Sequence, residues 1–208
     1  MAIKINREIA GDLNNPTTKL LNYCISQHQK ELRRLEKLSN YYDGEQEIIN
    51  RTKDNAAAPN NKVMVNHANY VVDMNVGFMV GNPIADTSSD AIDPILDAYT
   101  KVDIVSHDTE LEKDLSVFGV GYELIYLKQD IQTGKTYPAI KCIDPRGIFL
   151  VTDDTVDSNP LFAVHYQPIF SLQGGILYHL VKYYNDNRVL TYKTNSIGIG
   201  HYELIKAL

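Results

Sequence analysis

The chain changes its hydrophobic period once, at Gly119, and this change constrains the fold more than any other feature. Before it, apolar residues recur at three- and four-residue steps, which is typical of helices. After it, short runs that alternate in part lie between turn residues, which is typical of strands. Residues 1–118 are therefore predicted to be mainly helical and residues 119–208 mainly β. The layout predicts an α+β fold, in which N-terminal helices pack with a C-terminal antiparallel β-rich region.

The longest predicted helix follows the turn at Asn14–Thr17 and stops at Asp43-Gly44. It could exceed roughly twenty residues, about 30 Å at the standard rise. Its opposite face is basic, but Glu31 and Glu36 interrupt the cations, so a solvated or subunit-contacting face is favoured over a nucleic-acid site. The apolar stripe comprises Ile25, Leu32, Leu35, Leu38 and Tyr42, and the polar face comprises Gln29, Lys30, Arg33, Arg34 and Lys37.

The segment Asn66–Pro83 predicts a second helix with both ends marked. The Asn66 side chain can accept a free backbone N–H of the first turn. Gly81 can take the left-handed conformation that ends a helix, and Pro83 forbids its continuation. Apolar residues at helical steps predict that this helix is buried: Tyr70, Val71, Met74, Phe78 and Met79.

The remaining helical half is less regular. The first dozen residues look loosely held, Glu45–Asn50 is predicted as a short helix or turn, and Lys53–Asn61 as an exposed loop. Asp93-Pro94 predicts a helix start, with Asp93 as the cap and proline at the first position. Ser106 is expected to cap a further helix that reaches Phe118.

The second half predicts a series of antiparallel strands. Strands at Val120–Leu127 and Ala139–Ile143, joined by the turn Thr133-Gly134-Lys135, form a predicted hairpin. Further strands are expected over Ile148–Val151, Phe162–Tyr166, Leu177–Tyr184 and Val189–Lys193.

Composition excludes several classes of protein. Lys and Arg total 20 against 26 Asp and Glu, for a net charge of −6, which argues against a clamp that grips duplex DNA. No run is long enough to cross a bilayer, and the N-terminal residues lack the apolar core of a secretory signal. Cys24 and Cys142 lie far apart in the sequence, so two reduced thiols are expected rather than a disulfide scaffold or a zinc site.

Enzymatic chemistry has little support in the sequence. There is no Walker lysine motif and no Gly-x-Ser-x-Gly elbow, and the six histidines show no zinc spacing. His165 and His179 could meet across strands. Neither a cofactor nor a metal is expected. The alternative hypothesis is a metal-dependent hydrolase or nuclease, whose carboxylates and imidazole would be Asp144, Asp153, Asp154 and His165.

Several short motifs, taken in order, resemble the N-terminal part of phage portal proteins of the SPP1 type. They are Tyr41–Ile48, Asn60–Val63, the helix from Asn66 to Gly81-Asn82-Pro83-Ile84, Phe118–Leu124, and the turn Asp144-Pro145-Arg146 that leads into Ile148–Val151. The motif residues that we single out as structural are Tyr42, Gly44, Asn66, Gly81, Pro83, Gly119, Gly121, Tyr122, Asp144 and Pro145.

The resemblance implies a structural subunit and no catalysis. Portal proteins form a ring, typically of about twelve subunits, at one capsid vertex, and double-stranded DNA passes through it. Partners implied in this way are capsid, scaffold, terminase and connector proteins, with assembly in the bacterial host cytoplasm and a final place in the virion. Residues 1–208 would form a single wing-type region, and the stem, clip and crown would be absent.

Overall fold

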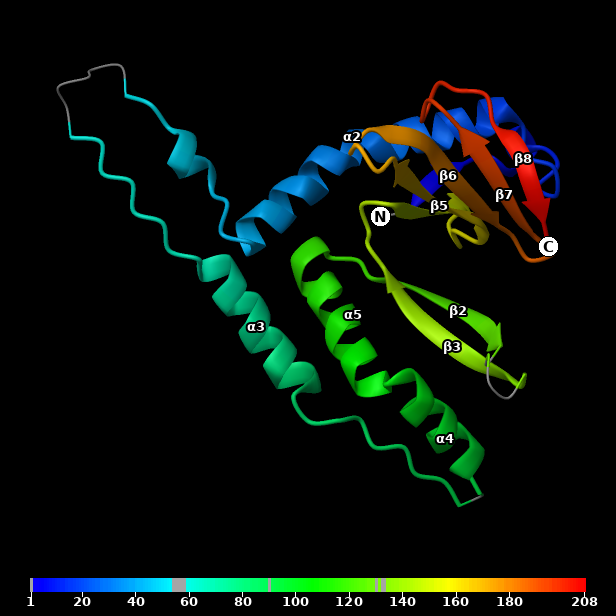
Figure 1. Cartoon of the computed structure of the whole chain (residues 1–208), viewed down its shortest axis with the longest axis horizontal. Coiled ribbons are helices and arrows are strands. Elements are labelled where there is room, and N and C mark those ends of the chain that lie inside the picture. Colours follow the sequence, from blue (N-terminus) through cyan, green and yellow to red (C-terminus); the bar gives the residue numbers. More distant parts are fainter. Residues whose placement is uncertain (1, 54–58, 90, 130, 132–133) are drawn as a thin grey trace. The chain divides into compact units, whose positions relative to one another are not determined.

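The computed structural model describes the chain except for residues 1, 54–58, 90, 130 and 132–133 (Figure 1). Its described residues combine helices with a largely antiparallel sheet, which confirms the predicted α+β class. The chain divides into two compact units. The sheet unit contains the residues up to Arg34 together with Arg146–Leu208, and the helix–hairpin unit contains Leu35–Pro145.

The sheet unit holds a six-stranded sheet in the order β1-β4-β5-β6-β7-β8. All neighbours are antiparallel except β1, which pairs parallel to β4. The predicted strands after residue 147 are confirmed, with slightly wider bounds. The elements of this unit are β1 (Ile3–Ile5), α1 (Arg7–Ala10), the first part of α2 (Thr18–Tyr42), β4 (Ile148–Asp153), β5 (Pro160–Phe170), β6 (Ile176–Tyr184), β7 (Val189–Thr194) and β8 (Glu203–Ala207).

The core of the sheet unit lies between α2 and one face of the sheet. Alternate residues of β5 are buried, because successive strand side chains point to opposite faces. From α2, residues one turn apart enter the same core, which confirms the predicted packing of this helix with the β-rich region. Its fully buried side chains include Leu21, Cys24, Ile25, Phe149, Val151, Val164, Val181 and Tyr183.

The expectation of a loosely held N-terminus was wrong. Residues Ile3–Ile5 pair with Val151–Asp153 of β4, and Ile5 is buried in the core. The Asn6 side chain accepts a hydrogen bond from the Glu8 N–H, which caps α1. The strand is too short to show a period, and its partner lies far along the sequence, so local patterns do not reveal it. β8 was likewise not predicted.

The helix–hairpin unit begins with the last turns of α2. The predicted hairpin is confirmed, with Tyr122 opposite Ile143 and Gln129 opposite Thr136. The expected loop over 53–61 and the turn at 133–135 fall partly outside the described residues, which omit 54–58 and 132–133. The further elements are η1 (Glu47–Asn50), α3 (His67–Val80), α4 (Asp93–Val102), α5 (Ile104–Phe118), β2 (Tyr122–Gln129) and β3 (Thr136–Ile143).

Two helix starts differ from those predicted. Ile92 rather than Asp93 is the cap residue of α4. Asp93 lies in the first turn, where its negative charge interacts favourably with the positive end of the helix dipole. α5 begins at Ile104, so Ser106 lies inside the helix. The two helices are separated by Asp103 alone, whose φ of 52° is left-handed. This left-handed residue interrupts the run of backbone hydrogen bonds between α4 and α5.

The prediction that α3 is buried was wrong. Among its apolar residues only Val72 is buried, whereas Phe78 is 88% exposed. A helical period of apolar residues shows that one side of the helix is apolar, but it does not identify what covers that side. Each of the five apolar side chains that predicted burial stays more than half exposed.

Candidate functional site

The motif residues Tyr42 and Gly44 meet the distant motif residue Asn66 where α2 ends and α3 begins. The Asn66 Nδ2 atom donates to the Tyr42 backbone carbonyl at 2.8 Å, and its Oδ1 atom accepts from the Asn69 N–H at 3.1 Å. Gly44 has a φ of 85°, and a Cβ atom placed there would lie 3.2 Å from Asn66 Nδ2. One side chain thus caps α3 and ties it to α2, and the glycine leaves room for that contact.

The Tyr42 side chain extends this junction to two further helices. Its hydroxyl donates to Asp73 Oδ1 of α3 at 3.1 Å. The Lys113 ammonium of α5 lies 4.7 Å from the centre of its ring, within the range of a cation–π contact. Tyr42 therefore links α2, α3 and α5.

Replacement of Asn66 tests this junction. Asn66→Ala should lower the free energy of unfolding by about 1–2 kcal/mol, since a cap and a second hydrogen bond are both lost. Asn66→Asp keeps the capping oxygen but cannot donate to Tyr42, so its loss should be smaller. Urea denaturation followed by circular dichroism measures both, with the exposed Asn61→Ala as the control. Equal losses for the two variants would show that the bond to the Tyr42 carbonyl matters and the cap does not.

A second group of motif residues lies where α5 passes into β2. Gly119 ends α5 in the left-handed conformation, with a φ of 74°, and its N–H donates to the Leu115 carbonyl at 2.9 Å. At Gly121 a Cβ atom would lie 2.7 Å from Leu111 Cδ1, so the strand approaches α5 too closely for a side chain. Tyr122 then opens the hairpin opposite Ile143.

Two further pairs of motif residues, Gly81 with Pro83 and Asp144 with Pro145, lie outside these two groups. Gly81 follows α3 as predicted, but the expected left-handed conformation was wrong, because its φ and ψ of −63° and −25° are right-handed. Pro83 two residues later forbids a continued helix, since it has no N–H to donate. At the end of the helix–hairpin unit, the Pro145 side chain is fully buried, whereas Asp144 is exposed. Functional roles for the ten motif residues remain predictions.

The Asp/His constellation of the alternative hypothesis does not converge. His165 pairs with Ile148, at the opposite end of β4 from Asp153, which puts them about 16 Å apart along the sheet. His165 faces Lys182 and His179 faces Pro168 in the register of β5 and β6, so the two histidines do not pair. Asp154 accepts a hydrogen bond from Asn6 at 3.3 Å. The described residues contain no group of three or more His, Cys, Asp or Glu placed to hold a metal ion.

Asp153 has a structural role instead. Its carboxylate accepts from the Thr155 hydroxyl at 2.6 Å, from the Asn159 amide at 3.0 Å, and from the backbone N–H groups of both residues. These bonds, with the Thr155 hydroxyl first and the Asn159 amide second, lower the pKa of Asp153. The carboxylate therefore fixes the loop between β4 and β5.

The lowered pKa predicts a pH dependence of stability. The stabilisation by Asp153 should be fully present above the pKa of an unfolded aspartate, about 3.9, and should be lost as the pH falls through the lower folded pKa. The melting temperatures of the wild type and Asp153→Asn should therefore differ most near neutral pH and converge in acid. A difference that grows below pH 4 would contradict this assignment.

An unpredicted cluster joins α5 to the hairpin. Buried His107 places Nε2 3.1 Å from Glu123 Oε2 and Nδ1 3.4 Å from Cys142 Sγ. The order thiol, imidazole, carboxylate resembles a catalytic arrangement, but burial and then the charges of Glu110 and Asp114 raise the pKa of Cys142 to about 11. A protonated thiol is a poor nucleophile and a suitable donor to Nδ1, so the cluster is a structural link. The three residues are too far apart in sequence to suggest it.

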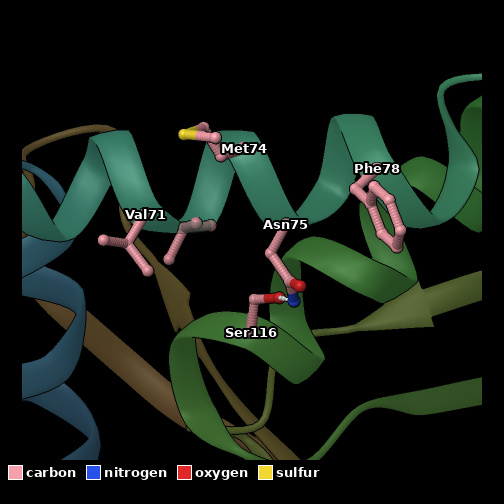
Figure 2. A pocket seen from close by; sticks show the side chains of 6 residues that line it. Val71, Met74, Asn75, Phe78 and Ser116 are labelled. Atoms are coloured by element: carbon pink, nitrogen blue, oxygen red, sulfur yellow. Dashed lines mark hydrogen bonds between the residues drawn. The ribbon is translucent and has the colours of Figure 1, made fainter.

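A shallow hollow of about 430 Å³ lies between α3 and α5 (Figure 2). Asn75 points from α3 to α5, where its Nδ2 donates to Ser116 Oγ at 2.7 Å and to Glu112 Oε1 at 3.2 Å. These bonds hold the two helices together. Apart from Asn75 and Ser116, the side chains that line the hollow are apolar. The hollow is lined by Val71, Val72, Met74, Asn75, Phe78 and Ser116.

The basic face of α2 is partly neutralised. Arg34 Nε lies 3.2 Å from Glu31, and Lys37 Nζ lies 2.9 Å from Glu47. All four side chains are largely exposed, so these pairs contribute little to stability. They fit the predicted solvated or subunit-contacting face.

Comparison with known protein families identifies a match. The family model described as "Phage portal protein, SPP1 Gp6-like" matches residues 21–207, which is most of the chain. No curated protein matches it significantly. Within the described residues, we find no helix whose length and apolar character would suit a bilayer crossing.

Proposed function

The chain belongs to the SPP1 Gp6-like family of phage portal proteins and has the structural role of that family; from this we propose that it is one subunit of a closed ring at a capsid vertex. Double-stranded DNA would enter and leave the head through this ring. About twelve copies would close it by a head-to-tail contact, in which two different patches of each subunit meet. The chain would perform no catalysis.

The observation that carries this proposal is the family match over residues 21–207. Several of the motif residues also have structural rather than chemical surroundings. Asn66 caps a helix and binds Tyr42, Gly121 permits a close approach to α5, and Pro145 is fully buried. Such positions stabilise a shape, which is what an assembly subunit requires.

The acidic balance of the chain fits DNA that passes without being gripped. A net charge of −6 favours release of a polyanion, whereas a binding groove needs clustered cations. By membership of the family we further propose that the subunit lies in the virion at the portal vertex, after assembly in the host cytoplasm, and contacts capsid, scaffold, terminase and connector proteins.

Light scattering and negative-stain microscopy of the protein as its genome encodes it test the proposal. We expect closed rings of uniform subunit number. A protein that stays monomeric at every concentration would contradict ring formation. Metal-dependent nuclease activity that disappears in an Asp153→Ala, Asp154→Ala variant would contradict the absence of catalysis.

A further inference from the structure

We draw no further inference here: the strongest candidate, the exposed apolar stripe of α3 (Tyr70, Val71, Met74 and Phe78) beside the hollow between α3 and α5, carries none, because nothing in the part of the chain that the structure describes shows what covers it.

Discussion

Phe149→Ala should lower the free energy of unfolding by about 3–5 kcal/mol, the usual cost when a large buried aromatic side chain is removed. Phe149 is fully buried on β4 and lies 5.0 Å from the His28 ring and 6.4 Å from the Tyr166 ring, measured between ring centres. Its loss leaves a cavity beneath α2, because the His28–Tyr166 hydrogen bond of 2.8 Å holds the surrounding rings in place. Urea denaturation followed by circular dichroism measures the change.

The control for this experiment is Phe170→Ala. Phe170 is also on the sheet, at the end of β5, but it is 59% exposed, so its truncation should cost less than about 1 kcal/mol. Comparable losses for the two variants would show that burial in the α2–sheet core does not dominate the stability of the sheet unit.

Gly121→Val should destabilise the helix–hairpin unit by about 1–3 kcal/mol, the range for overpacking. The first added carbon alone would lie 2.7 Å from Leu111 Cδ1, 3.3 Å from Leu115 Cγ and 3.4 Å from the Leu111 carbonyl oxygen. The end of Leu111 can move, but the backbone of α5 cannot yield without opening its contact with β2. Hydrogen exchange of peptides from residues 104–143 should become faster, and those of the sheet unit should not change.

Gly77→Ala is the matched control for that glycine. A Cβ atom at Gly77 would meet no atom within 4 Å, and the residue lies inside α3. Alanine should therefore stabilise the helix by about 0.5–1 kcal/mol, because glycine loses more freedom on folding. If Gly121→Val were as harmless as Gly77→Ala, the close approach of β2 to α5 would not be a requirement of the fold.

Sequence patterns predicted what depends on neighbours along the chain. The α+β class, α2, α3 and the hairpin all follow from periods and turn residues that are local, and so do β4 to β7. The capping role predicted for Asn66 was confirmed by its bond to the Asn69 N–H. Its second bond, to the Tyr42 carbonyl, depends on two helices meeting and has no local signal.

The remaining features depend on pairing across long distances. β1 needs β4 as a partner, and the His107 cluster needs α5 and both hairpin strands, so neither produces a local pattern. The exposed stripe of α3 shows a different limit, because an apolar side predicts burial without saying whether the covering surface is internal or external. The residues of the Asp/His hypothesis do not converge, because strand register separates His165 from Asp153.

The parallel pairing of β1 with β4 has a consequence for the order of events during synthesis. Ile3 leaves the ribosome before its partner Val151, which follows only after every residue of the helix–hairpin unit has been made. That unit is contiguous in sequence, so it can become structured before β1 has a partner strand to pair with. We expect the six-stranded sheet to close late and slowly, since such distant partners must find each other against a large loss of chain entropy.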